Sequence, residues 1–116
     1  MVASLSEIQR KICLRFGASF LASASHLKLG ISKSFNPAQF PLNGLRHPPE
    51  GGTTGWYIWS GERFSTDPGF FVSLHVSHLQ SRCPEIMKYL GLGPGWRFLV
   101  APGQEDVWFD FSLIKV

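Results

Sequence analysis

Apolar residues recur at helical spacing near the start of the chain, at Leu5, Ile8, Ile12 and Phe16. With 3.6 residues per turn, these four side chains share one face of a helix. Ser4 and Glu7 have the spacing of a capping box, which marks a helix beginning just after Ser4. Gly17 follows the last apolar position and is expected to end the helix, because glycine adopts the left-handed conformation of a C-terminal cap. The pattern predicts an amphipathic helix between Ser4 and Gly17.

The spacing of apolar residues then changes to that of strands. Residues 18–24 and 27–31 alternate with a period of two, and Leu27, Leu29 and Ile31 fall on one side. Residues 55–59 are rich in the aromatic and β-branched types that suit a pleated surface. We expect strands in all three segments.

Between them, residues 32–54 carry many turn-forming residues, including the Asn43-Gly44 dipeptide and several prolines. This density predicts one long loop without a regular element, and loops of that length are often functional or mobile. Four apolar side chains are expected to hold the loop against the rest of the fold: Phe35, Phe40, Leu42 and Leu45.

Further along the chain, residues 74–90 favour one or two short helices. Residues 74–82 allow a first helix. Pro84 suits the first turn of a second one, over about residues 84–90, because proline has no N–H group to satisfy there. Gly91 is expected to close that helix.

The pattern of the last segment predicts a β-hairpin around a four-residue loop, residues 102–105. This loop length predicts three cross-strand pairs on one side of the sheet, namely Ala101 with Asp106, Leu99 with Trp108 and Arg97 with Asp110. The other side then collects Phe98, Val100, Val107 and Phe109, so that side is expected to face the core. Asp106, Trp108 and Asp110 would point outward.

These elements favour an α+β fold with a mainly antiparallel sheet, an N-terminal helix, short helices near residues 74–90 and a C-terminal hairpin. The 116 residues suit a single domain, and 44% are hydrophobic. We expect one domain over residues 1–116, with a helix and strands in 1–31, the long loop in 32–54 and most motifs in 55–116.

Charge and apolar content limit the possible partners and compartments. The net charge is +3, with +4 in residues 1–54 and −1 in residues 55–116. The basic residues are spread over a helix and loops rather than gathered on one element, which disfavours nucleic acid as a partner. The two cysteines do not form a secreted disulfide framework, and no apolar run is long enough to cross a membrane. We therefore expect a cytoplasmic protein with reduced thiols.

The possible catalytic groups are few. His75, His78 and Cys83 have a spacing that could serve a metal, but the chain offers neither a paired-cysteine motif nor a helical zinc-binding motif. Cys83 could be a nucleophile, because a helix N-terminus lowers the pKa of a thiol. Glu105, Asp106 and Asp110 could support acid–base chemistry. A small metal- or carboxylate-dependent hydrolase using His75, His78 and the acidic hairpin is thus the alternative, but we expect no metal and no cofactor.

The four tryptophans suggest a different class of function. Exposed rings beside a basic groove could stack on sugars or on single-stranded bases. We expect three of the four to be core or half-buried residues, because strand tryptophans usually pack against their neighbours.

Several motifs together resemble a bacterial family of immunity proteins from polymorphic toxin systems, immunity family thirty-three. The resemblance rests on residues 55–62 (GWYIWSGE), 74–79 (LHVSHL), Cys83-Pro84, 89–92 (YLGL), 94–98 (PGWRF) and 105–110 (EDVWFD). Phe16-Gly17-Ala18 and Gly44-Leu45-Arg46 extend it over nearly the whole chain. The resemblance implies a small α+β protein that binds and neutralises a toxin without performing a reaction. It assigns no catalytic residue.

For such a binding protein, we expect the partner to contact the outward side of the hairpin. Interfaces favour aromatic anchors in a polar surround, and Trp108 stands between Asp106 and Asp110. Glu105 in the loop and Glu62 are expected nearby. An acidic surface of this kind would attract the basic cleft of a toxin that acts on nucleic acid.

Overall fold

The computed structural model describes residues 4–65 and 67–114. Its first element, α1 (Leu5–Phe16), begins and ends where the sequence predicts. The Ser4 hydroxyl accepts a hydrogen bond from the backbone N–H of Glu7 at 3.2 Å, and Gly17 adopts φ 71° at the C-terminal cap. Both ends of α1 are therefore set by local capping residues that can be identified from the sequence.

The buried face of α1 follows the prediction in part. Ile12 is buried and Leu5 and Phe16 pack against the core as expected, whereas Ile8 is 36% exposed. Gln9 and Cys13 are buried as well, and Leu14, outside the predicted face, is 83% exposed. The Gln9 amide donates a 2.8 Å hydrogen bond to the carbonyl of Met87, so this polar side chain is satisfied inside the protein. The apolar spacing missed Gln9 because it counts only apolar residues.

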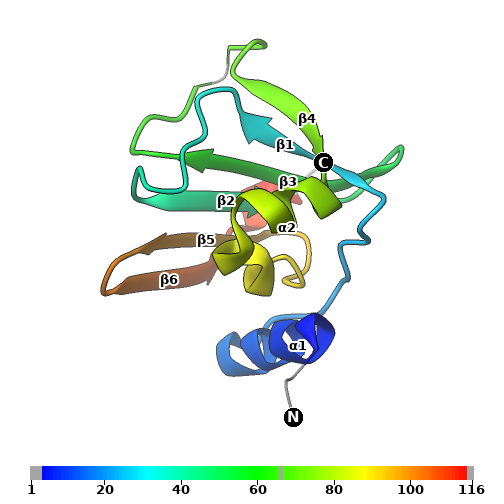
Figure 1. Cartoon of the computed structure of the whole chain (residues 1–116). Coiled ribbons are helices and arrows are strands. Elements are labelled where there is room, and N and C mark those ends of the chain that lie inside the picture. Colours follow the sequence, from blue (N-terminus) through cyan, green and yellow to red (C-terminus); the bar gives the residue numbers. More distant parts are fainter. Residues whose placement is uncertain (1–3, 66, 115–116) are drawn as a thin grey trace.

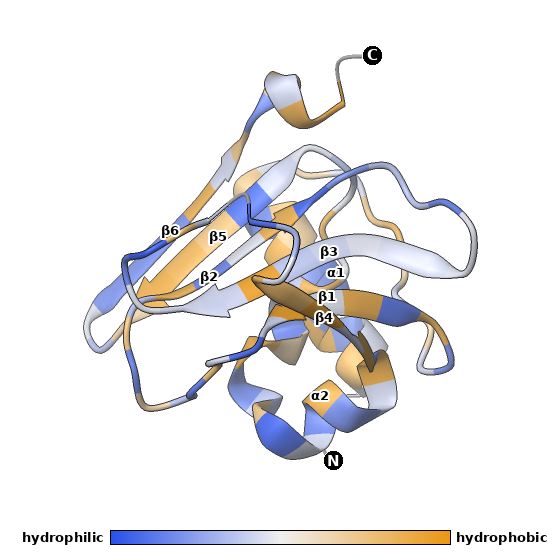
Figure 2. Cartoon of the chain, turned by 90° about the horizontal axis from the view of Figure 1, so that it is seen from above, coloured by the Kyte–Doolittle hydropathy of each residue, from blue (hydrophilic) through white to orange (hydrophobic). Residues whose placement is uncertain are grey.

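Within the described residues, six strands form one sheet in the order β4-β1-β3-β2-β5-β6, with α1 and the helices between β4 and β5 packed on one side (Figure 1, Figure 2). The strands are β1 (Lys28–Ser32), β2 (Leu42–Arg46), β3 (Thr53–Ser60), β4 (Phe71–His75), β5 (Trp96–Ala101) and β6 (Gln104–Phe109). Only the β1–β3 pairing is parallel among the described strands. The predicted α+β fold with a mainly antiparallel sheet is confirmed.

The prediction of a structureless loop over residues 32–54 is wrong, because β2 lies within it. All five residues of β2 are buried, and the strand pairs with both β3 and β5. Asn43-Gly44, which suggests a turn, is strand here for two reasons. The Asn43 amide donates to the carbonyls of Trp59 and Gly61, and a side chain at Gly44 would overlap the ring of Phe98. Of the four expected anchors only Phe40 is exposed, at 45%.

Residues 18–24 are also not a strand, apart from a single bridge between Phe20 and Leu92. Their carbonyls instead accept hydrogen bonds from the guanidinium of Arg46, which is 1% exposed. Arg46 donates to Leu21 and Ala22 in this segment and to further carbonyls of Thr54, Leu90 and Leu92. Burial lowers the pKa of Arg46 to about 10, so it remains charged at neutral pH.

The region of short helices is partly as predicted. Leu74 and His75 end strand β4, which the sequence did not reveal, and α2 (Val76–Arg82) follows. Pro84 begins the second helix as expected, a 3₁₀ helix η1 (Pro84–Tyr89). Leu90, not Gly91, is its C-terminal cap.

The C-terminal hairpin forms, but in a register two residues away from the predicted one. Pro102 and Gly103 make a two-residue turn, so Leu99 pairs with Asp106 and Arg97 with Trp108. Gly103 has φ 75°, a conformation that favours glycine, and proline suits the position before it. A shift by two preserves the faces of both strands, so Phe98 is buried as expected. The expected burial of Phe109 is wrong, because this residue at the end of β6 is 45% exposed and packs edge-on against Trp96.

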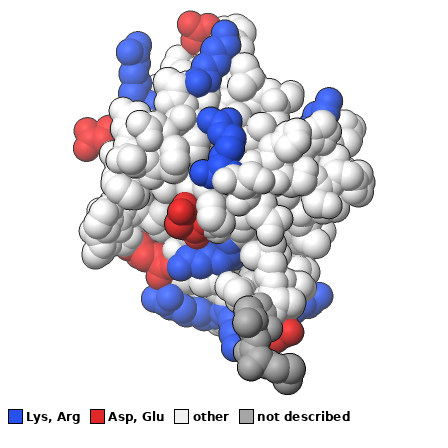
Figure 3. Space-filling view, viewed as in Figure 1, with Lys and Arg blue, Asp and Glu red and all other residues white. Residues whose placement is uncertain are grey.

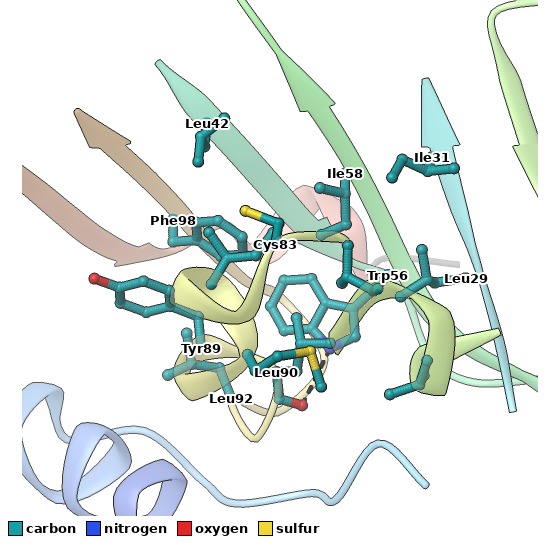
Figure 4. Close-up of a cluster of buried hydrophobic side chains, with 14 of the residues drawn as sticks. Leu29, Ile31, Leu42, Trp56, Ile58, Cys83, Tyr89, Leu90, Leu92 and Phe98 are labelled. Atoms are coloured by element: carbon teal, nitrogen blue, oxygen red, sulfur yellow. Dashed lines mark hydrogen bonds between the residues drawn. The ribbon is translucent and has the colours of Figure 1, made fainter. Parts of the chain in front are cut away.

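The main core lies between the sheet and the helices (Figure 4). Trp56 and Ile58 of β3 meet Leu90 and Leu92 there, and the Trp56 indole N–H donates to the Leu90 carbonyl at 3.2 Å. Phe98 stacks on Tyr89 with ring centroids 4.8 Å apart. Because every strand shares this one sheet and this core, the described residues form a single domain.

Candidate functional site

The side of the sheet that faces away from the helices, hereafter the open face, carries a row of neighbouring residues that crosses all six strands. The strand pairings define the row as Ser73, Gly30, Tyr57, Leu45, Arg97 and Trp108. An exposed sheet face normally alternates with the core face and is polar. Here Tyr57 is 38% exposed and Trp108 37% exposed, so two aromatic rings on the open face meet solvent.

A groove of about 480 Å³ surrounds Tyr57 on the open face. The Tyr57 ring leans over Gly30, where a Cβ atom would come within 2.7 Å of it. It also makes edge contacts with His47, at 5.6 Å between centroids, and with Phe71, at 5.2 Å. Phe64, from the segment between β3 and β4, lines the same groove and is 49% exposed. Sequence patterns did not single out this groove, although Tyr57 does alternate with the buried Trp56 and Ile58.

On the hairpin side of the open face, Trp108 is held in place by a charged pair. The Arg97 guanidinium lies over the Trp108 ring, 5.2 Å from its centroid, and donates to the Asp110 carboxylate at 3.1 Å. The predicted proximity of Arg97 and Asp110 is therefore confirmed, despite the shifted register. Hydrogen bonds from Ser112 and from Arg97 hold the pKa of Asp110 below its usual value.

Two further acidic residues lie on this side. Asp106 is exposed and neighbours Leu99 across the hairpin, and Gln104 donates to its carboxylate at 2.9 Å. Glu62, just beyond β3, lines a shallow depression together with Leu99, Ala101 and Gln104. We call Glu62, Asp106, Trp108 and Asp110 the hairpin patch.

Glu105 does not belong to the hairpin patch, because it lies on the helix side of the sheet. Its carboxylate accepts a short hydrogen bond from the Tyr89 hydroxyl and forms a 2.9 Å ion pair with Arg15 of α1. Burial, followed by the Glu105 contact, raises the pKa of Tyr89. Glu105 thus joins the hairpin to η1 and α1. The two-residue turn explains this, since it puts Glu105 into the strand, where adjacent residues point to opposite sides.

The residues of the alternative hydrolase do not assemble into a site. His75 and His78 contact each other edge-on, with centroids 5.5 Å apart, but no third ligand joins them. Over residues 4–65 and 67–114, no three His, Cys, Asp or Glu side chains converge to hold a metal ion. Glu105 lies on the other face from Asp106, so the acidic hairpin residues are split as well.

Cys83 is not an activated thiol. It is buried at the start of η1, and its thiol donates to the Glu85 carboxylate at 2.9 Å. Burial, together with the Glu85 contact, raises the pKa of Cys83 to about 12. The expected lowering by the helix terminus is outweighed by burial in an apolar environment. Cys13 and Cys83 are both free thiols.

The four tryptophans do not together form an exposed stacking surface. Trp56 and Trp59 are buried, Trp96 is half-buried and Trp108 is the exposed one, as the sequence led us to expect. On the side that carries α2, lysine and arginine are separated by uncharged surface and by acidic residues (Figure 3). No helix of the described residues is long and apolar enough to span a membrane.

Comparison with known proteins agrees with the resemblance seen in the motifs. The Imm33-like domain family matches residues 8–110, which include most of α1 and all six strands of the described sheet. No curated protein and no solved structure matches the chain at a significant level. Because the match covers far more than half of the chain, this protein belongs to the Imm33-like domain family.

Proposed function

We propose that this protein is a cytoplasmic immunity protein that binds a bacterial toxin and neutralises it by contact, without a reaction of its own. The family name supports the proposal. The observation that carries it is the open face of the sheet, where aromatic rings remain exposed although the helix side already holds a fully formed core.

An exposed apolar face needs an explanation beyond stability. A sheet needs only one buried face to fold, and its solvent face is usually polar. Exposed aromatic residues rimmed by polar ones are typical of surfaces that bind another protein. Tyr57 and Trp108 belong to the residue types that most often anchor such interfaces.

The hairpin patch is the part of this face that we propose contacts the toxin first. Trp108 is preorganised, because Arg97 and Asp110 fix its surroundings before any partner binds. A fixed side chain loses little conformational entropy on binding. The exposed carboxylates of Glu62 and Asp106 favour a basic partner surface and accelerate its encounter. Toxins that act on nucleic acid carry such surfaces.

The test is co-expression with candidate toxin domains from neighbouring genes, with bacterial growth and the binding kinetics of the purified pair as the readouts. Wild-type protein should restore growth. Trp108→Ala should weaken toxin binding at least about 30-fold, the loss typical of an interface anchor. Asp106→Lys should slow association more than it speeds dissociation, because it acts on electrostatic attraction.

Leu14→Asp is the matched control, since Leu14 is an exposed apolar residue of α1 on the helix side. Its growth rescue and toxin binding should equal those of the wild type. Wild-type protein that fails to rescue growth, while folded and soluble, contradicts the proposed function. Full rescue by both patch variants contradicts the hairpin patch as the binding surface.

A further inference from the structure

We infer that the groove around Tyr57 is a second anchoring site of the same interface, and that it takes an uncharged aromatic or aliphatic side chain from a projecting loop of the toxin. This inference rests on the proposed function and adds where and what the partner must present.

The floor of the groove depends on the absence of a side chain at Gly30. Any residue larger than glycine at position 30 would meet the Tyr57 ring, at 2.7 Å for the Cβ atom alone. The ring therefore lies low against β1, with space above it. The groove has a volume of about 480 Å³, which falls within the roughly 300–1,000 Å³ of ordinary ligand pockets.

Aromatic rings line the groove on two sides of Tyr57. His47 and Phe71 contact the edges of its ring, and Phe64 belongs to an aromatic cluster with Trp59 and Phe71. Such rings bind another apolar side chain through burial of surface and edge contacts.

The charges of the groove lining balance. Among the described residues that line it, two are of the Lys, Arg, Asp and Glu types. These are Lys28 on β1 and Asp67 in the segment between β3 and β4. A lining of one cation and one anion around aromatic rings attracts neither a basic nor an acidic side chain preferentially. An uncharged apolar side chain is therefore the occupant that fits.

The distance between the two sites suits one interface. Tyr57 and Trp108 lie three strands apart in the same row, which corresponds to roughly 14 Å. The two-stranded hairpin offers only about 200 Å² of flat face, judged from strand spacing and rise. Stable interfaces bury about 800 Å² on each partner, an area that requires contacts well beyond the hairpin. The Tyr57 groove is where the same row next exposes an aromatic ring.

The first experiment probes the groove without the toxin. Nuclear magnetic resonance spectra are recorded while N-acetyltryptophanamide, N-acetylargininamide or N-acetylglutamate amide is added. N-acetyltryptophanamide should shift the amide signals of Gly30, Tyr57 and Ser73 and bind at least about 10-fold tighter than either charged probe. Tighter binding of a charged probe, or shifts confined to other parts of the protein, would overturn the inference.

Gly30→Ala is the most specific variant, because it leaves every lining side chain present and displaces the Tyr57 ring, which its Cβ atom would approach to 2.7 Å. It should weaken the binding of N-acetyltryptophanamide at least about 10-fold. Tyr57→Ala should do the same. If either variant lowers the melting temperature, Lys28→Gln and Asp67→Asn serve instead. Both residues are exposed, and the paired neutral variants should leave the preference for the tryptophan probe intact.

The second experiment separates this inference from the proposed function. In the co-expression assay, Tyr57→Ala should weaken toxin binding at least about 10-fold while Leu14→Asp does not. If wild-type protein rescues growth and Trp108→Ala does not, yet Tyr57→Ala and Gly30→Ala bind the toxin as the wild type does, the groove is refuted and the immunity function stands. If wild-type protein gives no rescue, the function itself is refuted.

Discussion

The two faces of the sheet are both rich in apolar residues, but aromatic rings are buried on the helix side and partly exposed on the open face. On the helix side, Trp56 is 1% exposed and its indole N–H is satisfied by a carbonyl, while the buried Arg46 serves several carbonyls at once. On the open face, Tyr57 and Trp108 each leave more than a third of their surface in solvent. The first face is complete as it stands, and the second offers surface to a partner.

The family-like motifs contribute residues to both faces of the sheet. Arg46, Trp56, Leu90 and Leu92 from these motifs are buried on the helix side. Tyr57 and Trp108 from the same motifs are exposed on the open face. The motifs therefore include residues that build the fold and residues that we propose meet the partner.

The largest expected effect is at Arg46, on the helix side. Arg46→Met should lower the free energy of unfolding by at least about 3 kcal/mol, because several buried carbonyls lose their donor together. Urea unfolding followed by circular dichroism measures this change. A loss under about 1 kcal/mol would mean that water replaces the guanidinium, and that the helix side is less complete than described.

A smaller effect is expected at Gly44, where β2 pairs with Phe98 of β5. Gly44→Ala should destabilise the protein by about 2–3 kcal/mol, because the new Cβ would lie 2.2 Å from the Phe98 ring and force it to move. Gly69→Ala is the matched control, since a Cβ there meets only ordinary contacts. Equal melting temperatures for the two variants would speak against the buried placement of β2.

The pH dependence of stability tests the burial of Cys83 on the helix side. The pKa of Cys83 is raised from 9.0 to about 12, so the unfolded state releases the thiol proton at a lower pH than the folded state does. The free energy of unfolding should be constant with respect to this group below pH 9 and should fall as pH rises from 9 towards 12. Denaturant unfolding at pH 8 and pH 10 would reveal the fall. Cys83→Ala should make it shallower, and an unchanged slope would contradict the raised pKa.

The smallest effect on stability is expected on the open face. Trp108→Ala should change the free energy of unfolding by less than about 1 kcal/mol, because more than a third of the residue is exposed and it lies outside the buried core. Thermal unfolding measures it. A loss above about 2 kcal/mol would show that Trp108 holds the hairpin together, and would weaken its assignment to a binding surface.

Local chemistry allowed part of this fold to be predicted. The ends of α1 follow from Ser4 and Gly17, and η1 begins at Pro84 as proline chemistry suggests. Strand β2 was missed because Asn43-Gly44 is a turn signal in isolation. Its strand conformation depends on the distant Phe98 ring and on carbonyls of β3, which local sequence does not reveal.

The candidate site was predictable to a similar degree. Alternation placed Asp106 and Trp108 on one face correctly, because a register shift of two residues leaves the faces unchanged. Glu105 was misplaced because the turn has two residues rather than four. Tyr57 was not singled out, since its importance depends on Gly30, a neighbour from another strand.

The most direct test of the open face as the toxin-binding surface is hydroxyl-radical footprinting of the free protein and of its complex with the toxin. This method reads the solvent exposure of individual side chains. We expect oxidation of Tyr57 and Trp108 to fall several-fold in the complex while oxidation of Leu14 and Ile8 on α1 stays the same. Protection of Leu14 and Ile8, with Tyr57 and Trp108 oxidised as in the free protein, would contradict this expectation and place the partner on the helix side.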